Sequence, residues 1–276
     1  MPEAESAAQP LIPALPPRVQ GRSHLRVFLT ALHAFLLREL KQQFGRSRLG
    51  YFWAVAEPAA TVAVLTLIHA GIRGGEAQIY GAHPIVFFVF GAVPFFTYFH
   101  CVNRCQNVCG SHKGLFNYRQ IKPVDIMLAR AIIEALSMLT VGVLFVIGWL
   151  WLGHDFSLPD PLVLLAAMLA LFALGLAVGL IFEVFGTVYP DLRRVFTIAM
   201  RPMIFISGLF FTIEMIPPQH RHLLTWNPVL HAVDFAREGV LAGYDSPASG
   251  SYLLLCILGL LLVAFSAYRR FMYRLI

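Results

Sequence analysis

Six long apolar runs restrict this sequence to a membrane fold. They cover residues 51–72, 84–105, 126–152, 162–185, 195–213 and 252–268. Each reaches roughly the 20 residues that, at about 1.5 Å per residue, cross a hydrocarbon core of about 30 Å. Hydrophobic residues make up 58% of the chain and charged residues 13%, against about 45–50% and about 25% in soluble domains. We therefore expect an all-α integral membrane protein with six transmembrane helices, and neither a soluble domain nor a disordered chain.

Two segments precede the first run. Residues 1–24 are polar and rich in proline without the apolar stretch of a signal peptide, and we expect a mobile tail. Residues 25–44 predict an amphipathic helix, because its apolar side chains share one stripe at about 100° per residue. The stripe contains Leu25, Phe28, Leu29, Leu32, Phe35, Leu36 and Leu40, and Glu39 and Gln43 interrupt it. Such a helix lies in the membrane interface or packs on a cytoplasmic subunit.

The distribution of Lys and Arg predicts the orientation in the membrane. The expected inner side carries seven between residues 18 and 48, four between 104 and 122, then Arg193 and Arg194, and three after residue 268. The expected outer side holds Arg73, Arg221 and Arg237. This bias places both termini in the cytoplasm. It also explains the formal net charge of +6 without a nucleic-acid partner.

The longest outer connection covers residues 214–251 and is long enough to hold structure of its own. After the breaker Asn227-Pro228, residues 229–241 predict a short helix. Such a segment is able to dip back into the outer leaflet if protein or water satisfies its backbone.

Nucleotide-binding and hydrolytic motifs are absent from the sequence. It contains no GxxxxGK[ST], HExxH or GxSxG pattern. We therefore expect no nucleotide cofactor on this chain, and if ATP drives transport here, another chain must bind the ATP. Cys101, Cys105 and Cys109 recur at every fourth position, but one helix face cannot complete a tetrahedral zinc site. These small residues predict close helix packing instead of a metal site.

Three segments follow the order found in the membrane subunits of type-2 ABC exporters. RELKQQFGRSRLGYFWAVAEP at 38–58 resembles the start of the first span. YPDLRR at 189–194 resembles the turn before the fifth span, and IPPQHRHLLTWNPVLHAVDFAREGVL at 216–241 resembles the outer segment. Within that family the chain is most similar to the KpsM-like permeases that export capsular polysaccharide. The O-antigen and teichoic-acid permeases are close alternatives.

The resemblance covers about residues 25–275 and implies a multi-pass homodimer in the bacterial inner membrane. It implies a separate ATPase subunit that binds ATP and Mg, a lipid-linked anionic glycan as substrate, and periplasmic and outer-membrane export partners. A membrane-embedded enzyme acting on lipid-linked sugars and an ion-coupled transporter are the other classes. The scatter of acidic and His side chains over four runs disfavours the first, and the lack of an evident inverted repeat disfavours the second.

Charged residues inside the runs are candidates for function, because charge within a membrane is costly. Arg201 contacts an anionic group of the substrate, for which Arg offers a bidentate fork, pairs with Glu57 or Glu183, or reaches the inner interface. Glu57 either lies on the substrate path, reaches the inner interface or pairs with Arg201. We expect Glu134 and Glu183 to be packing pairs.

The substrate path is expected to begin at the first run. Arg46, Arg48, Tyr51 and Trp53 lie at its start, either to gather an anionic headgroup or to anchor the span. Because sugar rings stack on aromatic side chains, we expect the passage to be lined by aromatic residues of the second and fifth runs. These candidates are Phe95, Phe96, Tyr98, Phe99, Phe205, Phe210 and Phe211. Lipid contact is the alternative role of each.

The connection SHKGLFNYRQIKP at 111–123 mixes basic and apolar residues. The resemblance implies that it contacts the ATPase, and the alternative is a membrane-edge loop with basic anchors. The residues expected to couple the two subunits are Lys113, Leu115, Phe116, Tyr118, Arg119 and Lys122.

Overall fold

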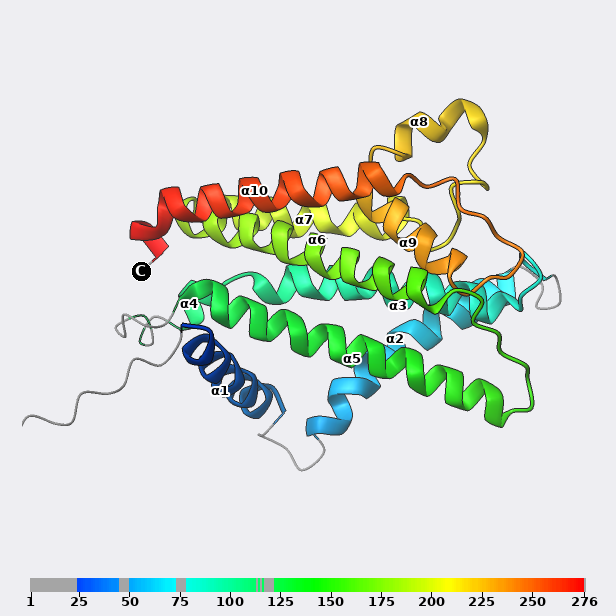
Figure 1. Ribbon diagram of the computed structural model, residues 1–276, viewed down its shortest axis with the longest axis horizontal. Coiled ribbons are helices and arrows are strands. Elements are labelled where there is room, and N and C mark those ends of the chain that lie inside the picture. Colours follow the sequence, from blue (N-terminus) through cyan, green and yellow to red (C-terminus); the bar gives the residue numbers. More distant parts are fainter. Residues whose placement is uncertain are drawn as a thin grey trace, which may run out of the picture.

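The computed structural model describes residues 24–44, 50–72, 78–112, 114, 116 and 122–275, which form a helical bundle (Figure 1). Its elements are α1 (His24–Phe44), α2 (Gly50–Ile72), α3 (Pro84–Cys105), α4 (Val108–Ser111), α5 (Pro123–Trp151), α6 (Pro161–Val188), α7 (Pro190–Ile206), η2 (Pro218–His220), α8 (Arg221–Leu224), α9 (Pro228–Glu238) and α10 (Gly250–Leu275). The only paired extended backbone in this part of the chain is an isolated bridge between Ile79 and Ala82. The expected all-α class is therefore confirmed for the described residues.

The two ends of the bundle carry different elements. α1, α4 and the last turns of α10 lie at one end, called here the α1 end, and α8 projects from the opposite end, called here the α8 end (Figure 1). The start of α1 and the end of α10 are thus on the same side of the molecule. That arrangement is what an even number of crossings produces.

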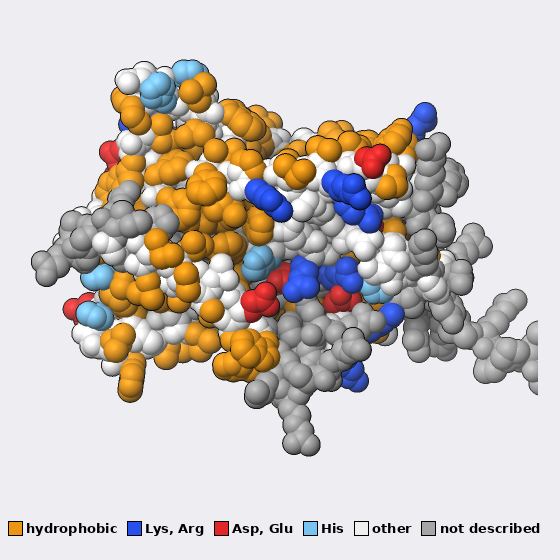
Figure 2. Space-filling view, turned by 180° about the vertical axis from the view of Figure 1, so that it is seen from behind, with side chains coloured by type: hydrophobic (Ala, Val, Ile, Leu, Met, Phe, Trp, Pro, Cys, Tyr) orange, Lys and Arg blue, Asp and Glu red, His pale blue; other side chains and the backbone are white. Residues whose placement is uncertain are grey.

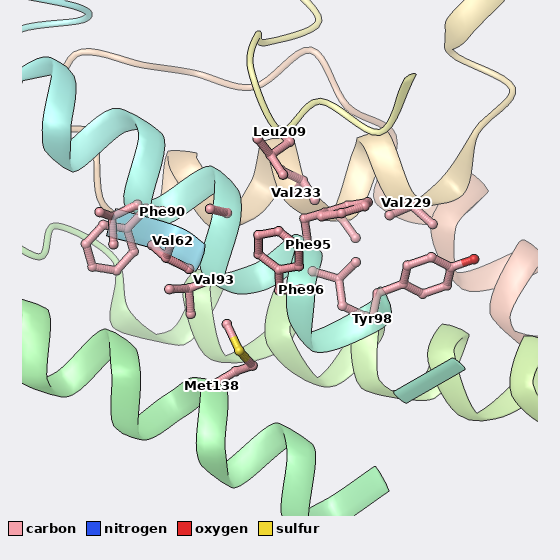
Figure 3. Packing of buried hydrophobic residues seen from close by; sticks show 14 of the residues in the cluster. Val62, Phe90, Val93, Phe95, Phe96, Tyr98, Met138, Leu209, Val229 and Val233 are labelled. Atoms are coloured by element: carbon pink, nitrogen blue, oxygen red, sulfur yellow. The ribbon is translucent and has the colours of Figure 1, made fainter. Parts of the chain in front are cut away.

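α3 forms the centre of the bundle. α2, α5, α6 and α9 pack against it, while α7 and α10 pack on α6. α3 is apolar on all sides, which is the pattern of a helix buried in protein. Figure 3 shows Phe95, Phe96 and Tyr98 of α3 in one cluster with Met138 of α5 and Val233 of α9.

Small residues let α3 and α6 approach closely. A Cβ atom added at Gly175 of α6 would lie 2.7 Å from the Cβ atom of Cys101, and one added at Gly179 would lie 2.6 Å from that of Cys105. Cys101, Cys105 and Cys109 are all free and buried. The expectation that these cysteines serve helix packing is confirmed, because no larger side chain fits between the two backbones.

Four helices of the described chain are long and apolar enough to cross a membrane, namely α3, α5, α6 and α10. In α2 the comparable apolar stretch covers Val55–Ile68. α7 has 17 residues and includes Arg193, Arg194 and Arg201. A count of six crossings therefore requires α2 and α7 in addition to the four.

The fifth apolar run does not stay helical to its predicted end. The pattern predicts a span over 195–213, but α7 begins at Pro190 and ends at Ile206. Gly208 then adopts a φ of +75°, a left-handed conformation that favours glycine. Likewise, the helix predicted over 229–241 is α9, from Pro228 to Glu238.

Two charged side chains of α9 replace the missing helical hydrogen bonds. Arg237 is completely buried and donates to the carbonyl oxygens of Gly208 at 2.5 Å, Leu209 at 2.6 Å and Phe211 at 2.8 Å. Asp234 accepts from the backbone N–H of Ile213 at 3.2 Å. Because unpaired backbone groups are expensive away from water, these contacts explain how residues 207–213 leave the helix inside the protein.

Candidate functional site

The candidate residues at the start of α2 are only partly described. Arg46 and Arg48 lie outside the described residues, and Tyr51 belongs to α2 without a described side chain. Trp53 is 58% exposed. Glu57, one turn further along, is also exposed. The described part of the first turns of α2 thus presents polar and aromatic groups on the outside of the single subunit.

Glu57 borders a polar pocket of about 140 Å³ between α2, α3 and α5. Its lining consists of Glu57, Pro58, Thr61, His100, Asn103, Arg104, Glu134 and Ser137. Arg104 Nε lies 2.8 Å from a carboxylate oxygen of Glu134, and His100 Nδ1 lies 3.6 Å from the other oxygen. The expectation that Glu134 is a packing pair is therefore confirmed, and its main partner is Arg104.

Arg201 is exposed on α7. Among the ion pairs of the described residues, neither Glu57 nor Arg201 takes part, and Glu183 pairs with Arg193 instead. Within the single subunit, Arg201 therefore does not pair with Glu57 or Glu183. Figure 2 shows Lys and Arg side chains at the surface beside a largely apolar area.

The aromatic candidates differ in exposure and form three groups. Phe95, Phe96 and Tyr98 have exposed fractions of 0%, 5% and 3% and lie in the core of the single subunit. Phe99, Phe210 and Phe211 are half-buried. Phe205 is 66% exposed. Of these seven candidates, Phe205 is the one whose ring is mostly exposed on the outside of the subunit.

The candidates for coupling to an ATPase lie mostly outside the described residues. These are Lys113, Leu115, Tyr118 and Arg119. Phe116 is buried in a cluster that also contains Phe35 of α1. Lys122 is exposed immediately before α5, and its backbone N–H donates to Asp125 at 3.2 Å. The described part of this connection is thus attached to α1 and to the start of α5.

A buried carboxylate joins α1 to the same connection. Glu39 is 7% exposed, and its oxygens lie 2.5 Å from Arg130 Nε of α5 and 3.8 Å from His112 Nε2 next to α4. Burial lowers the pKa of His112, and the nearby Arg130 charge lowers it further. The acidic residue that interrupts the apolar stripe of α1 therefore faces protein, where it has two partners.

A second buried carboxylate holds the turn between α3 and α4. Glu183 of α6 is 1% exposed and accepts from the backbone N–H of Cys109 at 2.7 Å and from that of Asn107. Arg193 of α7 donates to the Asn107 side chain at 2.8 Å and lies 3.9 Å from Glu183. Glu183 is a packing pair, as expected, and it links three elements at the α1 end.

Comparison with known proteins identifies the family. Residues 30–241 match the ABC-2 type transporter family. The chain is 35% identical to the polysialic acid transport protein KpsM of Escherichia coli over 250 residues, which cover 90% of this chain and 96% of KpsM.

The chain belongs to the ABC-2 type transporter family.

More distant relatives of this ABC-2 transporter have capsule-related names. This chain is 27% identical over 253 residues to the capsule polysaccharide export inner-membrane protein CtrC of Neisseria meningitidis serogroup B. The alignment covers 86% of this chain and 89% of CtrC. The chain is also 27% identical over 259 residues to the capsule polysaccharide export inner-membrane protein BexB of Haemophilus influenzae, which covers 89% of this chain and 91% of BexB. These matches extend over nearly the whole length of each relative.

Sequence reasoning missed the role of one residue of this ABC-2 transporter. Arg237 was expected only as a basic residue of the outer side, whereas the structure buries it completely, with its guanidinium 4.2 Å above the Phe87 ring. A sequence signal was present. Asp234 and Arg237 are one turn apart in a short helix that follows Asn227-Pro228, so the two charges fall on one face.

Proposed function

We propose that the chain is the membrane-spanning permease subunit of an ATP-driven exporter that moves lipid-linked anionic capsular polysaccharide across the bacterial inner membrane. The proposal is supported by the names of KpsM, CtrC and BexB and by the extent of each match. Export of O-antigen or teichoic acid is the alternative for the same type of machine. The absence of a nucleotide-binding motif assigns ATP and Mg to a partner subunit.

In this proposal two permease subunits pair with two ATPase subunits, and periplasmic and outer-membrane proteins continue the path. α2, α3, α5, α6, α7 and α10 cross the membrane, and α1 lies in the cytoplasmic interface. The α1 end faces the cytoplasm with both termini, which agrees with the excess of Lys and Arg there. The α8 end then faces the periplasm.

The observation that carries the proposal is the position of Arg201. It is exposed about two-thirds of the way along α7 and has no ion pair among the described residues. Such a side chain is rarely turned toward lipid, and it points instead to a partner or a water-filled path. Pro202, which follows it, removes the N–H that would serve the Ile198 carbonyl in the helix. An exposed cation and an available carbonyl suit an acidic, hydroxyl-rich substrate.

The remaining site assignments follow from this path. We assign the candidates Arg46, Arg48, Tyr51, Trp53 and Glu57 to its inner opening. Phe205 lies beyond Arg201 on α7. The connection 111–123 contacts the ATPase. Glu39 attaches α1 to this connection. The buried rings of Phe95, Phe96 and Tyr98 belong to the protein core behind the path. They support its shape.

The proposed function is tested by deletion and complementation in the source bacterium. Deletion should remove polysaccharide from the cell surface while lipid-linked glycan accumulates inside, and the chain should restore export only with an ATPase subunit that hydrolyses ATP. Sugar analysis of the lost surface polymer distinguishes capsule from O-antigen or teichoic acid. Normal surface polysaccharide in the deletion strain would refute the proposal.

A further inference from the structure

We propose that Glu57 of one copy of the chain forms an ion pair with Arg201 of the partner subunit, so that each copy completes the polar pocket of the other. The inference rests on the pairing of two permease subunits in the proposed function, and it names the contact between them. A two-fold dimer contains this pair twice, because a contact of residue i with residue j is repeated as j with i.

The polar pocket beside Glu57 contains more acidic than basic partners. Arg104 lies 2.8 Å from Glu134 and is therefore already paired, and His100 also faces Glu134. Glu57 takes part in no ion pair within the described part of the chain, although it is exposed at the edge of the pocket. Figure 2 shows acidic, basic and His side chains gathered at the surface beside a largely apolar area. A cation from outside the subunit would balance the charge of this pocket.

Arg201 is the matching cation on α7. One turn to either side of it, the same face exposes Ile198 at 63% and Phe205 at 66%. Glu57 likewise follows Trp53, which is 58% exposed, by one turn of α2. A single charge in an exposed apolar stripe is costly against lipid. Both stripes therefore suit a helix–helix contact in which the two charges meet.

Arg201 lies at the level of Ala177 on the neighbouring helix α6. The Phe196 ring stacks on that of Phe182, with the centroids 4.1 Å apart. α6 and α7 are consecutive, antiparallel helices joined at Tyr189 (Figure 1). Arg201 comes five residues after Phe196 and Ala177 five residues before Phe182, so each lies about 7.5 Å along its helix from the stacked rings.

Glu57 lies at the same level of the bundle. Residues 101–105 of α3 pack against α6 on both sides of Ala177, at Gly175 and Gly179. The pocket beside Glu57 is lined by three residues from this same turn of α3. The two charges are therefore at one depth in the membrane. A two-fold axis along the membrane normal preserves depth, so the charges of two copies are able to meet.

Polar groups around Glu57 support an ion pair that is enclosed between two copies. Such a pair needs additional hydrogen-bonding groups to offset the loss of water. Thr61, Asn103 and Ser137 line the pocket and supply hydroxyl and amide groups beside Glu57. While the pairs are closed, Arg201 is occupied, and the path that it borders becomes accessible where the two copies separate.

Cross-linking between two differently tagged copies tests the contact. One copy carries Glu57→Cys and the other Arg201→Cys, both with Cys256→Ser, and they are expressed with the ATPase subunit in cells that make no glycan. The three other cysteines are buried. A short bis-maleimide should join the two tags. Leu262→Cys in place of Arg201→Cys is the control, since Leu262 is 69% exposed on α10. It should give at least about tenfold less product, because cross-linking follows local concentration.

Charge reversal distinguishes an ion pair from simple proximity. The reporter is a second cross-link, from Trp53→Cys in one copy to Ile198→Cys in the other, one turn before the charges on helices that both run away from the α1 end. Glu57→Arg or Arg201→Glu in both copies should reduce this product at least about tenfold, because like charges then meet. The two reversals together should restore it to within about twofold, as expected of a coupled pair. The tags report the membrane level of each variant, to which the product is normalised.

Three outcomes would overturn the inference. They are no product from the Glu57→Cys and Arg201→Cys copies, equal product with Leu262→Cys, and failure of the double reversal to restore the reporter cross-link. The last result would assign Glu57 to another cation, such as a lipid ammonium group or a metal ion. Each of these outcomes leaves the complementation test unaffected, whereas failure to restore export refutes the proposed function whatever the cross-linking data.

Discussion

At the scale of single residues, the packing around Arg237 leaves the least space for change. The guanidinium needs its carbonyl partners and also needs space, which Gly91 of α3 provides. A Cβ atom added at Gly91 would lie 2.0 Å from Nη2 of Arg237 and 2.7 Å from the carbonyl oxygen of Leu209. One glycine on α3 thus determines whether the outer segment can dock on the bundle.

We predict opposite results for two glycines in helix interiors. Gly91→Ala should lower the free energy of unfolding by roughly 2 kcal/mol or more, because it displaces a buried hydrogen-bonded charge. Gly259→Ala on α10 is the control, since nothing lies within 4 Å of its added Cβ atom. It should be neutral or stabilising, because alanine favours helix more than glycine does. Thermal unfolding of the purified permease measures both, and equal effects would contradict this account.

The arginines of α7 show what residue-level sequence reasoning could and could not reach. Arg201 is recognisable as a candidate because it interrupts an apolar run. Arg193 and Arg194 are indistinguishable by sequence, and only the position of Asn107 and Glu183 separates a structural arginine from an exposed one. Likewise, burial of Phe95 and Phe96 depends on helices that are distant in sequence.

At the scale of elements, α1 and the turn after α3 are each attached by a buried carboxylate. The contact between Glu39 and His112 lies outside the membrane-spanning helices and is sensitive to pH. Burial and the Arg130 charge lower the pKa of His112 below its ordinary value of 6.5, with a smaller contribution from Arg38, while the Val108 carbonyl and Glu39 oppose this shift. His112 therefore loses its proton more readily in the closed contact than an ordinary histidine does.

We predict that α1 loosens as the pH falls through about 6.5. A histidine with a lowered folded-state pKa stabilises the folded contact above the unfolded pKa, and this stabilisation is lost as protons bind more readily to the open state. Hydrogen exchange in residues 30–40, corrected for the intrinsic rate, should be faster at acidic than at neutral pH. His112→Gln should remove the pH dependence, and its persistence in that variant would assign the effect to another group.

The backbone hydrogen bonds that Glu183 accepts lead to a second prediction at this scale. Glu183→Gln retains the shape but places an N–H₂ group beside backbone donors, so at least one donor loses its acceptor. We expect a loss of roughly 2 kcal/mol in stability and faster hydrogen exchange confined to residues 106–112. Asp155→Asn, at an exposed position, is the control and should change neither. If hydrogen exchange in residues 106–112 is unchanged in Glu183→Gln, these hydrogen bonds are dispensable.

At the scale of the whole molecule, the buried contacts of Glu39 and Glu183 lie at the α1 end, and the outer segment lies at the α8 end. The apolar runs predict most of this architecture, because hydrophobic length decides which segments form membrane helices. They do not predict the end of α7, since Asp234 and Arg237 reach it from a helix that begins more than twenty residues later. Hydropathy contains no record of such a distant hydrogen bond.

Accessibility to an impermeant maleimide tests the proposed topology. In a background with Cys256 replaced, a cysteine at Gln219 should react in intact spheroplasts, whereas a cysteine at Arg270 should react only after permeabilisation. Both native residues are exposed, at opposite ends of the bundle. Reaction of both or neither in intact spheroplasts would contradict two termini on the cytoplasmic side.

The central position of α3 has a consequence for synthesis at the ribosome. α3 is made second among the proposed crossings, yet its neighbours α5, α6 and α9 are all translated later. The carboxylate that accepts from the Asn107 and Cys109 N–H groups arrives only with α6, and the arginine beside it only with α7. A nascent chain halted before α6 therefore exposes an unfinished turn and an unpacked aromatic helix. Chains truncated there should be degraded quickly by membrane proteases, and co-expression of the missing half should protect them.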